Sequence, residues 1–478
     1  MPINSFLYPG PTNSNPYVVD NSCRFDGSSD NYMHKTPGSA GNRRTFTISA
    51  WVKRSDPGNH RCIIASGDGA ARDMLLFESS DKLQFSRYDG SYVYQLNSNA
   101  LFRDPSAWLH IVGQIDTTQS TESDRVKLYV NGVQITSLAV ENYPSQNFDT
   151  DWNSTEKVRV GVDTDDNAEY NGNMCEVCMI DGSALAPTSF GEFNEDSPTI
   201  WQPKDVSGLT FGTNGFYLDF EDSGTLGNDA NGGTDFTLVN LDATHQSTDT
   251  CTNNFATLNS LTKTSYTTLA EGNLELLGNT SSDQGHSDST ISASSGKWYA
   301  EVKVIATNTT GGTASYPRYG IRHINNKEYG RLLNGGVGSP GRYFDNEGLY
   351  QSDGQKYIDA STSSFGDTFA ANDIIGIAVD YDNGAVYFSK NGTFQNSGNT
   401  ASGASKTGAL VTWTPANLDG FVFGSTEYND SKSHWNFGNP VHSISSGNSD
   451  ANGYGNFEYA VPSGYYALNT KNLAEFGG

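Results

Sequence analysis

The feature that most constrains the fold is a recurring Asn-Gly pair, set between short segments that alternate apolar and polar residues. Asn-Gly supplies the two positive φ angles of a type I′ turn, whose twist matches that of the strands it joins. Before the turn at 131–132, for example, Val126, Leu128 and Val130 share one face. Repeated hairpins of this kind predict an antiparallel β protein. The pairs begin at Asn131, Asn171, Asn214, Asn231, Asn334, Asn383, Asn391 and Asn452.

Composition agrees with many short strands joined by tight turns. The 478 residues include 51 Gly, 12% aromatic residues and only 17% charged residues. Such a chain has ample material for a core and for turns, and it does not resemble a helical bundle. No stretch repeats apolar residues at helical spacing. We therefore predict an all-β fold.

Two blocks of strand patterns flank a segment of different character. The first block covers 21–187 after an N-terminal arm at 1–20, and the second covers 296–478. The intervening segment, 188–295, carries eleven acidic residues and one basic residue between 190 and 250, yet it contains the alternating sequence NGFYLDF. We predict two β-sandwiches joined by an acidic, partly β-structured bridge that packs on them.

The charge balance excludes some classes of partner. Asp and Glu total 54 against 29 Lys and Arg, so the formal net charge is −25. A field of that sign repels nucleic-acid phosphates and anionic membranes. No apolar run approaches the ~20 residues that a bilayer span needs, and no signal peptide is visible. We expect neither nucleic-acid binding nor membrane insertion.

The cysteines do not form an obvious framework. They are Cys23, Cys62, Cys175, Cys178 and Cys251. An odd, sparse set in a long chain argues against a disulfide scaffold, and Cys175 and Cys178 have no second pair for zinc. On a regular strand, residues three apart point to opposite faces. We expect these two cysteines to be structural.

Signatures of catalysis are absent from the sequence. A retaining glycosidase needs two carboxylates about 5 Å apart, and no ExDxxE pattern supplies them. The nearest acidic strings, 219–222 and 380–382, adjoin turns, where Asp is a common turn former. No HExxH, GxSxG or P-loop pattern occurs. We predict no catalytic residues.

One acidic loop is a candidate metal site. Asp163, Asp165 and Asn167 have the spacing of the first three ligands of a calcium loop. Ala168 and Met174 occupy the positions where an EF-hand has Gly and Glu, so the loop is not an EF-hand. A calcium site and a solvated acidic turn both remain open.

A local inversion of charge lies between 316 and 343, where Glu328 is the only acidic residue among basic residues and tyrosines. Arg forks bind carboxylate or phosphate, and Tyr faces stack on sugars. The stripe therefore forms either a pocket for an anionic surface glycan or a contact with the acidic bridge or a neighbouring subunit; the bridge acids, which need partners, favour the contact. Its candidate ligand residues are Arg318, Tyr319, Arg322, Tyr329, Arg331, Arg342 and Tyr343.

Two further aromatic residues flank the acidic loop of the first block. Trp152 precedes the loop and Tyr170 follows it. Exposed aromatic residues beside polar loops form a platform for a sugar ring, whereas buried ones belong to the core. Both interpretations are open for these residues.

Particular segments resemble known domain families. FTISAWVKRS at 46–55, WLHIVGQID at 108–116 and KLYVNGVQI at 127–135 resemble a laminin-G-like, concanavalin-A-like jelly roll. SGKWYAEVKV at 295–304 and GIAVDYDNGAVYFSKNGTF at 376–394 resemble a SPRY domain. The resemblance implies two concanavalin-like jelly-roll sandwiches, and it implies that a rim loop of the first could hold calcium.

The order of the parts resembles structural proteins of tailed bacteriophages, marine ones in particular. A laminin-G-like domain, an acidic Asn/Gly-rich linking sequence at 201–232 and a SPRY-like domain follow one another. This resemblance implies a virion surface protein (tail fibre, knob or adhesin) that assembles in the bacterial cytoplasm. It implies contacts with other capsid or tail proteins, a homo-oligomer and non-enzymatic binding of a host surface glycan. The alternatives are a decoration or cement protein without a ligand and, ranked last, a concanavalin-fold glycan hydrolase.

Overall fold

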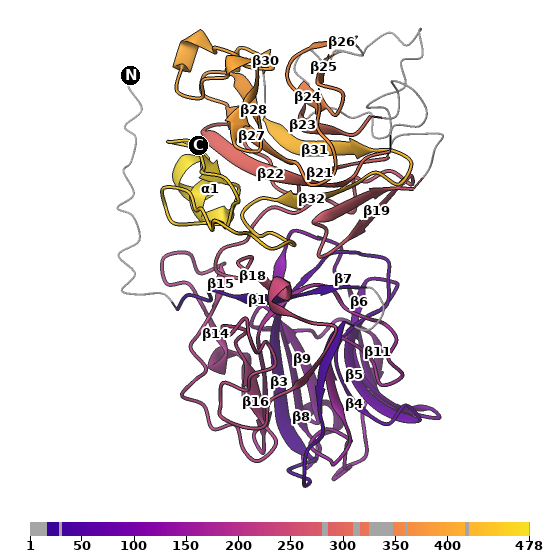
Figure 1. Cartoon of the computed structure of the whole chain (residues 1–478). Helices are drawn as coiled ribbons and strands as arrows, with labels where there is room; N and C mark the ends of the chain where they lie inside the picture. Colours follow the sequence, from indigo (N-terminus) through magenta and orange to yellow (C-terminus); the bar gives the residue numbers. More distant parts are fainter. Residues whose placement is uncertain are drawn as a thin grey trace.

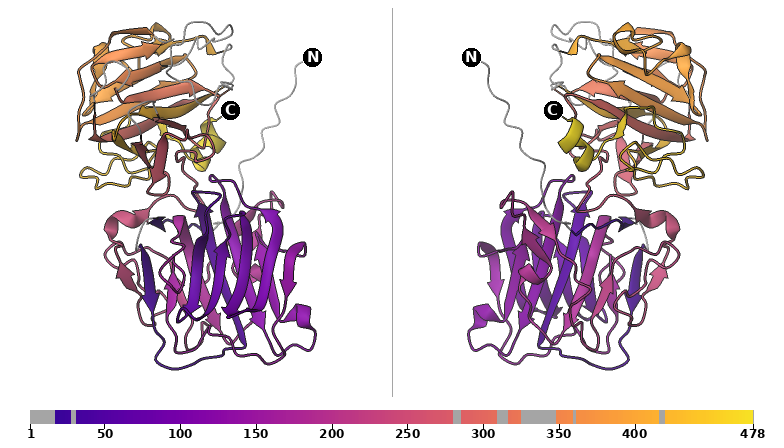
Figure 2. Two further views of the ribbon diagram at one scale, coloured as in Figure 1. Left: turned by 90° about the vertical axis from the view of Figure 1, so that its right-hand side faces the viewer. Right: turned by 90° about the vertical axis from the view of Figure 1, so that its left-hand side faces the viewer.

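The computed structural model describes residues 17–27, 31–279, 285–308, 316–324, 348–358, 361–415 and 420–477. Two β-sandwiches are stacked one above the other (Figures 1 and 2), the first built from the chain up to about residue 250. One α-helix, α1 (Thr470–Phe476), lies within the described ranges. None of the helices described there is long and apolar enough to cross a membrane. The all-β prediction with two sandwiches is confirmed.

The first sandwich consists of two antiparallel sheets. The first sheet has the order β10 (Val133–Gln134), β9 (Val126–Val130), β8 (Trp108–Asp116), β3 (Thr45–Arg54), β13 (Asn171–Asp181), β1 (Ser22–Asp26), β18 (Gln246–Ser247), and β16 (Phe216–Leu218) also pairs with β13. The second has the order β11 (Leu138–Asn142), β7 (Tyr92–Leu101), β6 (Lys82–Asp89), β5 (Ala71–Phe77), β4 (Arg61–Gly67), β12 (Val158–Val160), β2 (Tyr32–Lys35), β17 (Thr237–Val239). A separate hairpin joins β14 (Gly191–Phe193) to β15 (Trp201–Pro203).

The second sandwich repeats the two-sheet plan. Its larger sheet has the order β19 (Thr267–Ala270), β20 (Glu275–Gly278), β32 (Lys432–Asn436), β22 (Lys297–Ala306), β27 (Ile374–Asp380), β28 (Ala385–Lys390), β29 (Thr393–Phe394), and it also takes up β30 (Val411–Thr412) and β33 (Tyr466–Ala467). The other sheet has the order β21 (Gly285–Asp288), β31 (Phe421–Glu427), β23 (Arg318–His323), β24 (Gly348–Gln351), β25 (Gln355–Ile358), β26 (Ser361–Ser364).

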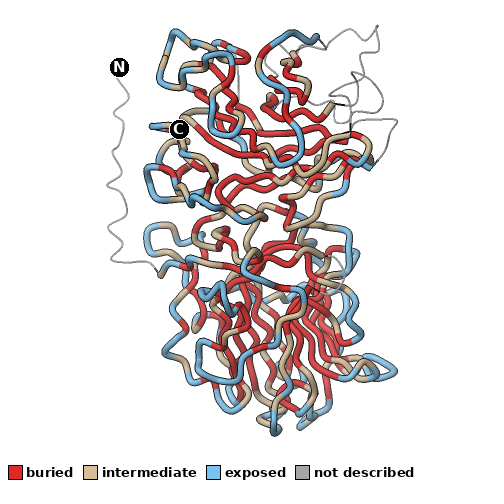
Figure 3. The backbone as a smooth tube through the Cα atoms, viewed as in Figure 1, coloured by how far each residue is buried: buried red, intermediate tan, exposed pale blue. Residues whose placement is uncertain are grey.

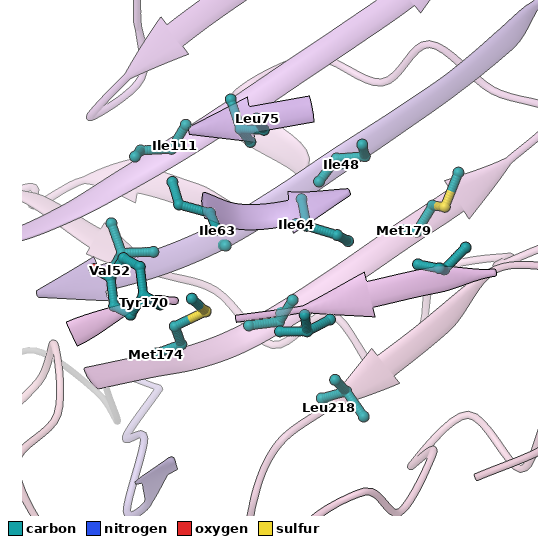
Figure 4. Close-up of a cluster of buried hydrophobic side chains, with 14 of the residues drawn as sticks. Ile48, Val52, Ile63, Ile64, Leu75, Ile111, Tyr170, Met174, Met179 and Leu218 are labelled. Atoms are coloured by element: carbon teal, nitrogen blue, oxygen red, sulfur yellow. The ribbon is translucent and has the colours of Figure 1, made fainter. Parts of the chain in front are cut away.

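Each sandwich has its own core, as expected when alternate side chains of two facing sheets point inward. In the first, Ile48 and Val52 of β3 face Ile63, Ile64 and Leu75 of the opposite sheet (Figure 4). Buried backbone runs through the strands of both sandwiches, and exposed backbone is concentrated in the loops (Figure 3). A second cluster of buried side chains fills the other sandwich.

The Asn-Gly pairs behave differently from one another. Asn131–Gly132 and Asn391–Gly392 have both φ angles positive, 48° and 78° in each, and form the β9–β10 and β28–β29 hairpins as predicted. Asn171–Gly172 instead begins β13, because Gly172 at φ 139° lies against the backbone of β3. A Cβ atom there would be 1.9 Å from the Lys53 carbonyl oxygen, so the close approach of two strands requires glycine.

On a regular strand, Cys175 and Cys178 are expected to point to opposite faces, and a bulge in β13 changes that. Glu176 has φ 51°, and the register with β3 shifts between the two cysteines. They therefore pair with Trp51 and Ser49, alternate residues that share one face of β3. The two cysteines do not point to opposite faces, because the extra residue of a bulge resets the alternation.

The segment 188–295 is divided between the two sandwiches. Up to about residue 250 it adds β16, β17 and β18 to the sheets of the first sandwich, and after 266 it adds β19, β20 and β21 to those of the second. The acidic bridge thus contributes strands to the sheets of both sandwiches.

A buried lysine connects the two sandwiches. Lys53, on the outward face of β3, donates from Nζ to Asp249 Oδ2 at 2.7 Å, Asn254 Oδ1 at 2.7 Å and the Phe255 carbonyl oxygen at 2.9 Å. Its side chain is 2% exposed and that of Asp249 is 1% exposed. All three donors of the ammonium are used on the segment that leads into the second sandwich.

An arginine in the same cross-strand row makes a second connection. Arg24 of β1 pairs in register with Asn173 of β13, which pairs with Lys53. Its guanidinium donates to Glu271 Oε2 at 3.0 Å and to the Thr244 carbonyl oxygen at 2.7 Å. Since Glu271 precedes β20, this contact also joins the first sandwich to the second.

Candidate ligand-binding surface

Three side chains form a row on the outward face of the second sheet of the first sandwich. Arg72 of β5 pairs in register with Tyr88 of β6, and Tyr88 pairs with Tyr92 of β7. The core side chains of these strands, Leu75 and Phe85 among them, lie on the other face. The Arg72 guanidinium lies 5.4 Å from the centroid of the Tyr88 ring, and the two tyrosine rings meet edge to face at 5.3 Å. We call these three residues the tyrosine row; Tyr92 is 43% exposed.

Amide side chains lie next to the tyrosine row on the same face. Gln95 Nε2 donates to Gln84 Oε1 at 2.9 Å, and Gln84 Nε2 donates to Ser86 Oγ at 2.8 Å. At the edge strand, Asn142 Nδ2 donates to the Tyr92 carbonyl oxygen at 3.0 Å. Because Gln84 and Gln95 are largely buried and hydrogen-bonded, they hold one orientation and support the exposed aromatic residues beside them.

The acidic loop after β12 adjoins the tyrosine row and is closed by its own hydrogen bonds. Asp163 Oδ1 accepts from the backbone N–H groups of Asp165 at 3.0 Å and Asn167 at 2.8 Å. Asn167 Nδ2 donates to the Asp165 carbonyl oxygen, and the Asp165 carboxylate is paired with Arg72. Burial raises the pKa of Asp163 above its usual value.

These contacts do not fit the calcium site that the spacing of Asp163, Asp165 and Asn167 suggested. Calcium takes six to eight oxygen ligands, whereas here a guanidinium holds one carboxylate and backbone N–H groups hold another. Within the described part of the chain, no group of three or more His, Cys, Asp or Glu side chains could hold a metal ion. The loop is an acidic turn that anchors Arg72 in the tyrosine row.

Comparison with protein families assigns both sandwiches. Residues 26–188 match the Laminin_G_3 model, described as the concanavalin A-like lectin/glucanases superfamily, and residues 298–414 match the SPRY domain. The chain carries a concanavalin-like domain followed by a SPRY domain. A comparison with curated proteins finds no match.

Three solved structures are similar to part of this chain. A heptameric SAP-like pentraxin from Limulus polyphemus is 13% identical over 36% of this chain and 80% of its own, with a TM-score of 0.28. The SPRY domain of human HERC1 is 14% identical over 37% of this chain and 96% of its own, with a TM-score of 0.26. Domain 4 of an extracellular arabinanase from Geobacillus stearothermophilus, in complex with arabinotriose, is 18% identical over 35% and 73%, with a TM-score of 0.28.

Trp152 and Tyr170 lie in the core of the concanavalin-like domain, which corrects their interpretation as a sugar platform. Both are fully buried. The Trp152 indole N–H donates to the Tyr94 hydroxyl at 3.3 Å, and Tyr94 donates to Asp73 at 2.7 Å. Burial raises the pKa of Asp73 to about 6. Side chains at these positions contact no solvent and cannot stack on a ligand.

The basic stripe belongs to the SPRY domain, and those of its candidate ligand residues that the structure describes are buried. Tyr319 packs in the core and donates to Glu427 Oε1 at 3.1 Å. The prediction that its ring stacks on a ligand is therefore wrong. Arg318 and Arg322 are 3% and 5% exposed. Arg322 pairs with Asp288, which lies in the predicted bridge, as the contact interpretation requires.

Arg318 also uses its guanidinium inside the protein. It donates to Gln351 Oε1 at 2.6 Å and lies 4.1 Å from the centroid of the Tyr357 ring. The open glycan pocket expected at Arg318 and Arg322 is therefore wrong. The remaining predicted ligand residues, Tyr329, Arg331, Arg342 and Tyr343, lie outside the described residues.

Sequence reasoning missed the tyrosine row itself. The segment SRYDGSYVYQ at 86–95 carries a turn signal between two alternating runs, which predicts a hairpin with Tyr88 and Tyr92 near its tip. The sequence does not show which face points outward, because Tyr94 of the same hairpin is a core residue. Only the packing of the two sheets against each other decides which face of the hairpin points outward.

Proposed function

We propose that the concanavalin-like domain binds carbohydrate at the tyrosine row. The observation that carries this proposal is the exposed Tyr92 ring beside Tyr88 and Arg72 on an outward sheet face. Aromatic rings pack against the C–H face of a sugar, and planar amide and guanidinium groups bond to its hydroxyls. The superfamily description of the matched model, which includes lectins, supports the same ligand class.

A single site of this kind binds weakly. A flat surface with two aromatic rings encloses little of a ligand, and a dissociation constant on the order of 1 mM corresponds to about 4 kcal/mol. Many copies on one particle would raise the avidity through effective concentration. The site thus suits a multivalent surface protein better than a scavenger of free sugar.

The proposal is for binding without catalysis. Asp73 and Asp151 come together in the concanavalin-like domain, but both accept from Arg87, at 2.7 Å and 2.6 Å. Asp73 also accepts from the backbone N–H of Asp151 at 2.7 Å. These contacts give the two carboxylates a structural role, since a hydrolase needs one free acid and one free base that face the substrate.

We further propose, from the sequence resemblance alone, that this chain is a bacteriophage virion surface protein that binds a host surface glycan. Other capsid or tail proteins and further copies of the chain would be its partners, and assembly would take place in the bacterial cytoplasm. Electron cryomicroscopy of the particle that carries the chain tests this. A tyrosine row facing solvent supports the proposal, and one buried on neighbouring subunits overturns it.

A glycan array provides the direct test of carbohydrate binding. The wild-type chain is compared with Tyr92→Ala and with Tyr266→Ala, a matched control because Tyr266 is a partly exposed tyrosine of the other domain. We expect Tyr92→Ala to weaken binding at least tenfold, which is about 1.4 kcal/mol, and the control to bind as wild type. Equal binding by all three proteins overturns the assignment of the site.

An apolar patch favours a second candidate function, the decoration or cement role. Val133, Phe193 and Ile200 are 60%, 44% and 57% exposed. The ring of Trp201, which follows Ile200, contacts Phe193 and closely approaches Gly132, which precedes Val133. Exposed apolar clusters often mark protein interfaces. Loss of particle incorporation in Ile200→Asp, with unchanged glycan binding, would assign the patch to assembly.

A further inference from the structure

A cavity of about 290 Å³ lies where the two domains meet. Residues 18–21 enter it from the concanavalin-like domain, and Thr248, Thr250, Asn253 and Phe255 line it from the connecting segment. The SPRY domain contributes 453–455 and Lys471, the latter in α1, which lies near the junction (Figure 1). We call it the junction cavity. A ligand held there touches both domains at once.

Lys471 provides a cation with unused donors. Its Nζ lies 5.4 Å from the centroid of the Tyr454 ring. Among the described residues, this ammonium has no hydrogen-bond acceptor and no ion-pair partner. Partial burial lowers its pKa, while Asp20 acts in the opposite direction. Such a group is poised to donate to an oxygen atom placed in the cavity.

Other polar side chains of the junction cavity also have hydrogen-bond donors or acceptors that remain unused. Within the described ranges, the carboxylate of Asp20, the amide of Asn21 and the hydroxyl of Tyr454 make no hydrogen bond to the protein. Asn253 is 7% exposed and accepts from the Lys471 backbone N–H at 3.3 Å, which leaves its amide donors available. The cavity thus presents both donors and acceptors around one aromatic ring.

This combination selects a neutral, hydroxyl-rich ligand. A ligand with a net negative charge is attracted by Lys471 but repelled by Asp20. A ligand with a net positive charge is attracted by Asp20 but repelled by Lys471. Hydroxyl groups satisfy both, because each donates to a carboxylate and accepts from an ammonium or amide. At about 30 Å³ for a water-sized group, the volume holds on the order of ten non-hydrogen atoms, the size of one sugar ring.

We propose that the junction cavity is a second saccharide site that binds one neutral sugar residue between the two domains. The proposal rests on carbohydrate binding as the function of the chain and adds a separate place for it. Asp20 and Lys471 contact hydroxyls of the sugar, and Tyr454 and Phe255 provide apolar contact. Because the ligand bridges the domains, its binding stabilises their packing.

The test uses calorimetric titration of the full chain with D-glucose, D-galactose, D-mannose and L-arabinose as separate probes. Lys471→Met keeps the alkyl stem over Tyr454 and removes the ammonium; Asp20→Asn removes the carboxylate charge. Lys82→Met in the first domain is the matched control. At least one probe is expected to bind in the Tyr92→Ala background, with affinity lowered tenfold or more by Lys471→Met and unchanged by Lys82→Met.

The outcomes separate the two sites. Binding that survives Lys471→Met and Asp20→Asn but disappears with Tyr92→Ala overturns the junction site and keeps the tyrosine row. If the Lys471→Met single variant loses all binding although Tyr92→Ala alone keeps it, the tyrosine row is overturned for these probes and the junction site is kept. No binding of any probe to the wild-type chain overturns the junction site, whereas the glycan array decides separately on the tyrosine row. Hydrogen–deuterium exchange gives an independent readout, since the bound probe is expected to protect 248–255 and 450–457.

Discussion

The sulfur atoms of Cys175 and Cys251 lie 3.6 Å apart, although 75 residues separate them along the chain. Cys175 is in the bulge of β13, and Cys251 belongs to the segment that connects the two domains. Both are free thiols, and burial raises the pKa of Cys251 well above its usual value. The connector is therefore held against the first domain by a contact that a small rotation would convert into a bond.

We predict that a mild oxidant joins this pair. Diamide takes one hydrogen from each thiol and is reduced to the hydrazine, leaving the Cys175–Cys251 disulfide. The bond closes a long loop, so chain entropy alone would raise the free energy of unfolding by about 4 kcal/mol, less any strain. Peptide mapping and a denaturant titration before and after oxidation measure both effects.

Cys175→Ser is the control, and it should abolish the rise in stability. Cys62 and Cys178 lie in separate clusters of buried residues and should remain reduced throughout. A disulfide that forms between Cys175 and Cys178 instead would contradict the geometry, because the thiol of Cys175 faces the connector.

Loss of the buried Lys53 ammonium is expected to be costly. Lys53→Met leaves Asp249 buried without its cation, and breaking a buried pair on one side costs about 3–5 kcal/mol. Arg44→Met, at the exposed pair with Asp149, should leave the free energy of unfolding nearly unchanged, because solvent screens this pair. Urea unfolding of the two variants compares them. Adding Asp249→Asn to Lys53→Met should recover part of the loss, and a further decrease would argue against the pairing.

Glu427 should make the stability of the SPRY domain depend on pH. Its complete burial raises the pKa of Glu427 to about 8, although hydrogen bonds with Ser433 and Tyr319 act to lower it. The folded state therefore keeps a proton that the unfolded state has lost, and stability falls as the pH rises from about 4.5 to about 8. The difference in free energy of unfolding between the wild type and Glu427→Gln should show that decline across this window.

Glu427→Gln keeps the size of the side chain and removes its titration, so the variant should lack the decline that Glu427 contributes. Glu458→Gln is the matched control. The pKa of Glu458 is lowered by hydrogen bonds from Ser445, so its contribution is lost only as the pH falls. If the free energy of unfolding of the wild type minus that of Glu427→Gln rose between pH 5 and pH 8, this would be inconsistent with a protonated Glu427.

Local signals in the sequence predict local structure well. The hairpins at Asn131 and Asn391 follow from the backbone angles that Asn-Gly allows, and their flanking strands follow from alternation. The two domain types follow from longer patterns of the same kind. Asn171 shows the limit, since the neighbouring strand β3 decides the conformation of Gly172.

The candidate site could not be predicted in the same way, because exposure is set by distant parts of the chain. Arg322 is buried through its pairing with Asp288, and Tyr319 through a core that strands from the whole second domain build. Charge and aromatic content identify the basic and aromatic residues of the stripe but do not show whether their side chains are exposed. The acidic loop at Asp163 did mark the neighbourhood of the tyrosine row, since Asp165 holds Arg72.

Trp152 and Tyr92 provide the sharpest separation of core from ligand surface. Trp152→Ala removes a fully buried indole and should lower the free energy of unfolding by about 3–5 kcal/mol. Its binding of glycan per folded molecule should stay at the wild-type value, since Trp152 contacts no solvent. Tyr92→Ala should have the opposite profile, with stability changed by less than about 1 kcal/mol and binding weakened at least tenfold. Chemical denaturation and ligand titration of the same preparations measure both quantities. Weakened glycan binding by folded Trp152→Ala would contradict the assignment of Trp152 to the core alone.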